Sequence, residues 1–108
     1  MFEIKKLENP KSGMKIRGEI DIYTAQTFKT AVLEEIGSDN KTFLLDLSEL
    51  TYIDSTGIGM LIEIRNEATE KGSALKLYHP RENVMKLLRL TGVDQIFEIV
   101  EEETHDCL

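Results

Sequence analysis

A pair of adjacent hydroxyl side chains, Ser55 and Thr56, has the clearest chemical potential in this sequence. Asp54 precedes the pair, and Gly57 and Gly59 follow it. Asp, Ser and Thr are the residue types that cap helices, because their side-chain oxygens accept hydrogen bonds from the free amides of the first turn. The glycines leave that turn without bulk, so a large molecule could approach the Ser55 hydroxyl. The pattern predicts a serine that is covalently modified at the start of a helix.

A buried strand precedes this segment. The apolar run from Phe43 to Leu47 has the length and continuity of a strand that is covered on both faces. A short loop is expected after it, and helical spacing begins directly after Ser55. In open α/β sheets, the loops at the carboxyl ends of parallel strands usually collect ligands. We therefore expect Ser55 at such an edge of the sheet.

Periodicity and turn residues assign the remaining elements. Strands are expected at 2–7, 14–20, 43–47, 74–78 and 96–100, and helices at 25–36, from 55 to a stop at Gly72, and from Pro80 to Gly92. Thr24 is expected to cap the first helix, which Gly37 ends, and a turn through 9–13 closes the first hairpin. A hairpin followed by alternating helices and strands predicts an α/β fold with a mixed sheet, helices mainly on one face and a right-handed crossover.

Composition fits one domain over residues 1–108, with 41% hydrophobic and 31% charged residues. The net charge is −7, but five acidic side chains lie between Glu98 and Asp106, so residues 1–97 hold 13 basic and 15 acidic side chains. We expect an acidic, frayed tail from about residue 101. No cluster of Lys and Arg is present to neutralise a phosphate backbone, which argues against nucleic-acid binding.

The sequence also predicts a cytoplasmic protein. No stretch approaches the roughly 20 apolar residues of a membrane span, and the first six residues lack the apolar centre of a signal peptide. The single cysteine, Cys107, cannot form an internal disulfide, which fits a reducing compartment. His105, Asp106 and Cys107 are adjacent in the tail and do not make a closed zinc site, so no metal is expected.

Enzymatic motifs fail when they are tested residue by residue. A serine-hydrolase elbow requires Gly-x-Ser-x-Gly, but Ile53 occupies the first glycine position, and only His79 and His105 could complete a triad. The chain contains no Gly-Lys pair for a phosphate-binding loop, and Ile62 replaces the third glycine of a dinucleotide fingerprint. We therefore expect a protein that is not an enzyme and needs no cofactor.

Two segments resemble the STAS family, the sulfate-transporter and anti-sigma-factor-antagonist domains. Residues 44–59 match its order of strand, Asp-Ser-Ser/Thr-Gly and helix, and residues 16–25 match its Gly-Glu-Leu-Asp turn with a Thr-Ala helix start. In the antagonist branch, the partner anti-sigma factor, a serine kinase, phosphorylates the serine after the aspartate. By position that serine is Ser55. The resemblance implies a partner-binding surface made of Asp21, Thr24, Asp54, Ser55, Thr56, Gly57 and Gly59.

The resemblance further implies a regulatory switch. The unphosphorylated protein would bind the kinase and free the sigma factor, phosphorylation at Ser55 would reverse this, and a PP2C-type phosphatase would restore the active form. Two alternatives stay open: a STAS subunit of a larger assembly, such as a stress-signalling scaffold or a lipid-transport complex, and a small-ligand or nucleotide-binding STAS domain. Simpler roles are also open, since Asp54 and Ser55 could be helix caps, Asp21 a turn residue, and the two glycines sites of close packing.

Overall fold

The computed structural model of the chain describes residues 2–6, 13–36 and 42–100. Its sheet has the order β1-β2-β3-β4-β5, in which β1 is antiparallel to β2 and the other neighbours are parallel. The strands are β1 (Phe2–Lys6), β2 (Gly13–Ile20), β3 (Thr42–Ile53), β4 (Ala74–Tyr78) and β5 (Glu98–Val100). The helices are α1 (Ala25–Glu35), α2 (Ser55–Glu70), α3 (Glu82–Leu90) and the short 3₁₀ helix η1 (Val93–Gln95). The predicted mixed α/β fold is confirmed.

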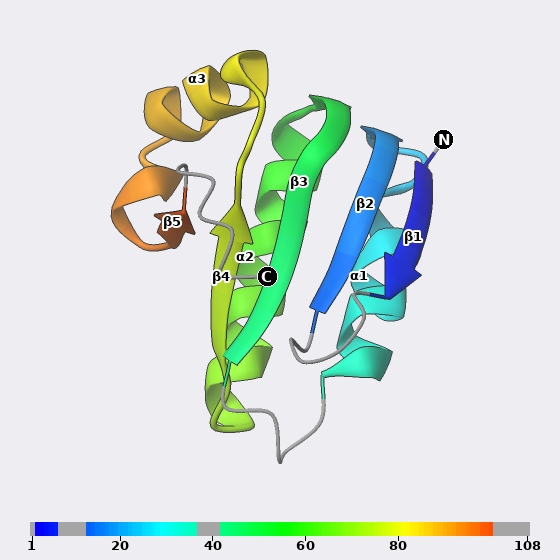
Figure 1. Cartoon of the computed structure of the whole chain (residues 1–108), viewed down its shortest axis with the longest axis vertical. Helices are drawn as coiled ribbons and strands as arrows, with labels where there is room; N and C mark the ends of the chain where they lie inside the picture. The colour runs from blue at the N-terminus through cyan, green and yellow to red at the C-terminus, as the bar shows by residue number, and fades with distance from the viewer. Residues whose placement is uncertain (1, 7–12, 37–41, 101–108) are drawn as a thin grey trace.

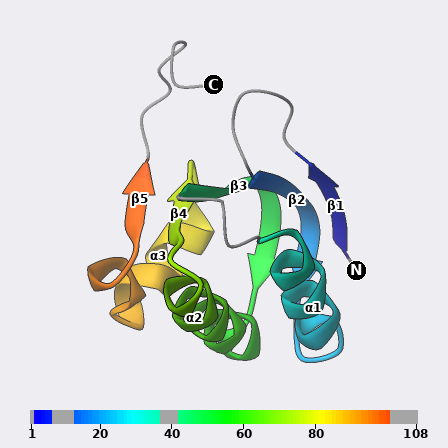
Figure 2. The ribbon, with the colours of Figure 1, turned by 90° about the horizontal axis from the view of Figure 1, so that it is seen from below.

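Helices α1 and α2 lie side by side against one face of the sheet (Figures 1 and 2). Phe28 and Val32 of α1 and Leu61 and Ile64 of α2 are completely buried beneath it. They belong to one hydrophobic cluster with side chains from the three central strands: Ile16, Ile20, Leu45, Leu47, Leu50 and Leu77. This cluster is the core that holds the start of α2 against the sheet.

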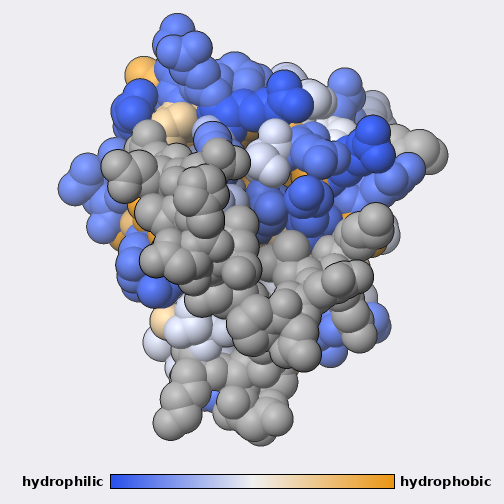
Figure 3. Space-filling view, in the orientation of Figure 1, coloured by the Kyte–Doolittle hydropathy of each residue, from blue (hydrophilic) through white to orange (hydrophobic). Residues whose placement is uncertain are grey.

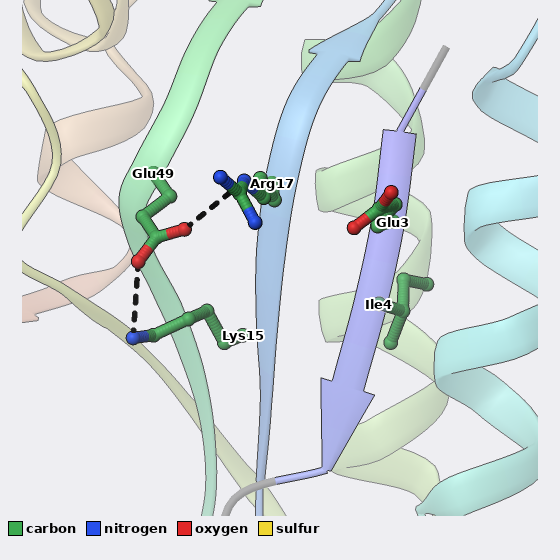
Figure 4. Close-up of a pocket in the computed structure, with 5 residues that line it drawn as sticks. All are labelled: Glu3, Ile4, Lys15, Arg17 and Glu49. Atoms are coloured by element: carbon green, nitrogen blue, oxygen red, sulfur yellow. Dashed lines mark hydrogen bonds and ion pairs between the residues drawn. The ribbon is translucent and has the colours of Figure 1, made fainter.

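The opposite face of the sheet carries polar side chains on β2 and β3. In the described part of the chain, hydrophilic side chains dominate this face (Figure 3). On β2 and β3, Lys15 and Arg17 both pair with Glu49, at N–O distances of 3.3 and 3.4 Å (Figure 4). Such partly exposed ion pairs stabilise a fold only slightly. These three side chains lie on the side of the sheet that faces away from α1 and α2.

Strand β3 is longer than the sequence pattern predicted, because it continues past Leu47 to Ile53 through the residues expected to form a loop. Along it the core-facing side chains are at positions 43, 45, 47, 50 and 53, so their spacing changes from two residues to three. Two irregularities in the pairing with β2 cause this change: positions 15 and 17 pair with 46 and 49, and positions 18 and 19 with 50 and 52. Each β-bulge adds one residue to β3 and returns the next apolar side chain to the core.

Strand β4 pairs with only the first half of β3, because their pairing ends at Asp46 and Tyr78. On that edge, the backbone groups of the second half of β3 need other hydrogen-bond partners. Side chains around the start of α3 supply them. Arg81 Nε donates to the Ser48 carbonyl at 3.0 Å, and Asn83 Nδ2 donates to the Thr51 carbonyl at 2.9 Å. Backbone carbonyls at a strand edge must find donors, so these two side chains replace the missing strand.

The other boundaries differ by a few residues. Helix α3 begins at Glu82 instead of Pro80, β5 begins at Glu98 instead of Ile96, and η1 was not predicted. The predicted turn at 9–13, apart from Gly13, the helix end at Gly37 and the acidic tail lie outside the described residues. Among the described helices, none is long and apolar enough to cross a membrane.

Candidate functional site

The predicted modification site lies where β2 and β3 end together. Ile20 and Ile53, the last residues of these parallel strands, are in register, and the Asp54 amide donates to the Ile20 carbonyl at 3.2 Å. Helix α2 begins at the next residue, Ser55, whose side chain is exposed. Within the described part of the chain the Ser55 hydroxyl makes no hydrogen bond. It is therefore accessible from the surface of the domain.

Asp54 caps α2, as predicted, and it also binds a second segment. One carboxylate oxygen, Oδ1, accepts from the Gly57 amide at 2.9 Å, and the other, Oδ2, accepts from the Ile22 amide at 3.1 Å. The Ile58 amide donates to the backbone carbonyl of Asp54. Asp54 therefore holds the loop that follows β2 close to Ser55, the residue directly after Asp54.

Asp21 organises that loop from within. Its Oδ1 accepts from the amides of Tyr23 and Thr24, at 2.9 and 3.1 Å, and from the Thr24 hydroxyl at 3.1 Å. Partial desolvation raises the pKa of Asp21, but hydrogen bonds from Tyr23 and Thr24 outweigh this and hold the pKa below its ordinary value. The structure thus gives Asp21 a turn-forming role and places it on the same edge as Asp54.

The prediction that Thr24 caps α1 is confirmed for its position, although its side chain forms no cap bond. Thr24 occupies the N-cap position, but its side chain accepts no hydrogen bond from the amides of the helix. Its hydroxyl oxygen instead accepts from the Asp21 amide at 2.9 Å. The reciprocal bonds between Asp21 and Thr24 close the loop on itself, which leaves the cap without a side-chain acceptor.

The two glycines after Ser55 have different surroundings. A Cβ atom on Gly57 would lie 2.6 Å from Ile53 Cγ1 and 3.0 Å from Ile20 Cγ2, so this glycine permits close packing of α2 on the strand ends. A Cβ on Gly59 would meet nothing within 4 Å. Gly59 lies four residues after Ser55, on the same side of the helix. Gly57 therefore serves packing, and Gly59 leaves open space beside the hydroxyl.

The sequence reasoning missed two residues of this surface, Ile22 and Tyr23. Both lie in the loop between Asp21 and Thr24, and their side chains are 64% and 90% exposed. The sequence did contain a signal for an exposed apolar pair, because Ile22 and Tyr23 stand between two polar residues that favour loops, Asp21 and Thr24.

His79 and possible metal-binding groups are the remaining features in the described part of the chain that could do chemistry. His79, the candidate base, lies at the end of β4 with a positive φ of 54°, and its ring packs edge-on against Tyr78. In the described ranges, no group of three or more His, Cys, Asp and Glu side chains is placed to hold a metal ion. The fold and the site together define a small mixed α/β domain that presents a serine hydroxyl at the start of a helix.

Comparison with known proteins agrees with this class. The STAS domain family profile matches residues 3–106. The anti-sigma-B factor antagonist of Listeria monocytogenes is 31% identical over 102 residues, which cover 94% of this chain and 90% of that protein. The anti-sigma-B factor antagonist of Bacillus subtilis is 34% identical over 99 residues, covering 90% and 87%. The crystal structure of a candidate anti-sigma factor antagonist from Thermotoga maritima superposes with a TM-score of 0.74 at 28% identity, covering 97% of this chain and 88% of that one.

This chain belongs to the STAS domain family, as its two sequence segments predicted.

Proposed function

We propose that this protein is an anti-sigma factor antagonist that is controlled by phosphorylation of Ser55. In its unphosphorylated form it binds an anti-sigma factor serine kinase and so releases the sigma factor. Transfer of phosphate to Ser55 ends the binding, and a PP2C-type phosphatase restores it. The protein acts by contact and has no catalytic activity of its own. The observation that carries this proposal is the exposed, unbonded Ser55 hydroxyl at the start of α2.

The names of the relatives from Listeria and Bacillus support the antagonist role. The geometry supports the choice of residue. A kinase must reach the hydroxyl from outside, and Ser55 is exposed whereas Thr56 is half-buried. Gly59 keeps the neighbouring helix surface open for the approaching active site.

The start of α2 can hold a phosphate without unfolding. Asp54 already occupies the amides of Gly57 and Ile58, but those of Ser55 and Thr56 have no partner among the described residues. Free amides and the positive end of the helix dipole both favour a bound phosphate. We therefore expect the phosphorylated domain to keep its fold.

The phosphate would instead act on the docked partner. A phosphoserine carries about −1.5 to −2 charges at neutral pH, and here it would stand beside the carboxylate of Asp54 and near that of Asp21. Like charges brought together in an interface cost several kcal/mol, and every ~1.4 kcal/mol is a factor of ten in affinity. A loss of roughly a hundredfold or more in affinity for the kinase is therefore expected.

Incubation with the purified cognate kinase and Mg-ATP tests the assignment. Intact-mass analysis should find one added phosphate, and phosphopeptide mapping should place it on Ser55. Ser55→Ala should abolish the addition and Thr56→Ala should not, while both variants keep the wild-type circular dichroism spectrum. A phosphate found on Thr56, Ser48 or Ser73 would contradict the proposal.

A charge mimic tests the mechanism of release. Ser55→Asp should weaken kinase binding, with backbone chemical-shift changes confined to residues near 21 and 54–60. Ser55→Asn, a neutral side chain of similar size, is the matched control and should bind more tightly than Ser55→Asp. Shift changes throughout the sheet, or full affinity of the phosphorylated protein, would refute an electrostatic switch.

The second candidate is a STAS subunit of a larger assembly that works by contact alone. On the open face of the sheet, the Lys15–Glu49–Arg17 ion pairs would offer such an assembly a charged contact surface at these residues. Retention of a free Ser55 hydroxyl favours the switch. An assembly subunit would bind its partners equally well with Ser55→Asp and Ser55→Asn.

A further inference from the structure

Among the described residues, five large apolar side chains are exposed, at positions 22, 23, 52, 90 and 96. Three of them lie at the end of the sheet that carries Ser55: Ile22 and Tyr23 follow β2, and Tyr52 is next to the last residue of β3. Single exposed apolar side chains are ordinary on protein surfaces. Ile22 and Tyr23, however, are adjacent to each other and together lie beside the modification site.

The backbone that carries this pair is rigidly held. The Ile22 amide donates to Asp54, and the Tyr23 amide donates to Asp21. The carbonyl of Asp21 accepts from the amides of Thr24 and Ala25 at 3.0 and 2.8 Å. All of these bonds involve the backbone or the Asp21 and Asp54 carboxylates, and none uses the Ile22 or Tyr23 side chain.

Several hydrogen bonds therefore hold a loop whose two apolar side chains are exposed instead of packed in the hydrophobic core. Tyr23 is 90% exposed, and Ile22 is 64% exposed. A fixed loop loses little conformational entropy when a partner covers it, so apolar groups on it contribute more fully to affinity. Tyrosine is also among the residue types that dominate binding energy at protein interfaces.

The position of the pair identifies its partner. Ile22 is hydrogen-bonded to Asp54, the residue directly before Ser55. A standard protein interface covers about 800 Å² on each partner, which is a disc of roughly 16 Å radius. An interface of this size centred on Ser55 would also cover the neighbouring loop with Ile22 and Tyr23.

We infer that Ile22 and Tyr23 are the affinity anchor for the kinase, and that they enter an apolar pocket beside the groove that receives Ser55. This inference rests on the proposed function. It extends that function by assigning docking and phosphate transfer to different residues. The loop supplies binding energy, and the start of α2 supplies the acceptor hydroxyl. Loss of the anchor should raise KM and leave kcat unchanged.

The test measures binding of the full chain to the purified cognate kinase in Mg-ADP, which holds the kinase in its nucleotide-bound form without a phosphate to transfer. Tyr23→Ala and Ile22→Ala are compared with Tyr23→Phe and with Leu90→Ala. Leu90 is the matched control, since it is 77% exposed but lies at the end of α3. Thermal unfolding of each variant verifies that the fold is intact.

Tyr23→Ala should weaken binding about 30-fold, the size expected of an interface hot spot, and Ile22→Ala should weaken it in the same direction. Tyr23→Phe, which keeps the ring, should stay within about fivefold, and Leu90→Ala within about twofold, of the wild type. With Mg-ATP, Tyr23→Ala should reach the wild-type rate of Ser55 phosphorylation at saturating concentration.

Unchanged affinity of Tyr23→Ala, with normal binding and phosphorylation of the wild-type chain, would overturn the anchor alone. An equal loss in Leu90→Ala would also overturn it, because the effect would then not belong to this loop. A wild-type chain that neither binds the kinase nor accepts phosphate would refute the proposed function itself.

Discussion

Substituting alanine for each of the two glycines after Ser55 should have opposite effects on stability. Both glycines lie in the first turns of α2, and an alanine at either position gains up to about 1 kcal/mol of helix propensity. At Gly59 nothing opposes this gain, since the new methyl group meets no atom within 4 Å. Gly59→Ala should therefore be stabilised by about 0.5–1 kcal/mol.

At Gly57 the new methyl group would lie 2.6 Å from Ile53 Cγ1 and 3.0 Å from Ile20 Cγ2. Both isoleucines are buried, and Cγ1 lies close to its own backbone, so rotation of a flexible end cannot relieve the contact. Overpacking of this kind costs about 1–3 kcal/mol. Because the propensity gain is nearly common to both variants, the difference between them measures the packing cost.

Urea denaturation of the two variants and the wild type gives that difference directly. We expect Gly57→Ala to be about 1–3 kcal/mol less stable than Gly59→Ala, which corresponds to a gap of several degrees in Tm for a domain of this size. The wild type should fall between them. If the two variants were equally stable, α2 would not be packed on the strand ends as described, and the placement of Ser55 would need revision.

Three other outcomes are expected. Asp54→Ala, which removes the helix cap and the bond to the Ile22 amide, should destabilise the fold by about 1–2 kcal/mol in urea unfolding, whereas Asp54→Asn should lose less. Asn83→Ala should cost about 0.5–1.5 kcal/mol, because the Thr51 carbonyl loses its donor, and an equally stable variant would show that water replaces it. Since the pKa of Asp21 is lowered in the fold from its ordinary 3.8, its contribution is present above that pH and is lost as the pH falls below it. Asp21→Asn should therefore flatten the acid limb of the stability curve, and an unchanged limb would contradict this assignment.

Local patterns in the sequence predicted much of this protein. The alternation in β2, the run from Phe43 to Leu47 and the helical spacing after Ser55 each report which side of one element is buried, and each element was found. The cap at Asp54 was predictable for the same reason, because it depends on an amide only three residues away. The pattern failed within β3, where two bulges change the apolar spacing and the strand continues to Ile53.

Contacts between distant segments were decided only in the tertiary structure. The hydrogen bond from Ile22 to Asp54 spans 32 residues, and the bond from Asn83 to Thr51 spans the same distance. No local pattern specifies such a pair, because it forms only after β2 and β3 align in parallel and α3 reaches the far half of β3. By itself, therefore, the sequence determined the family and predicted the acceptor serine. The parallel alignment of β2 and β3 decided that an exposed Ile22–Tyr23 loop lies beside that serine, because it brings the ends of both strands to one edge.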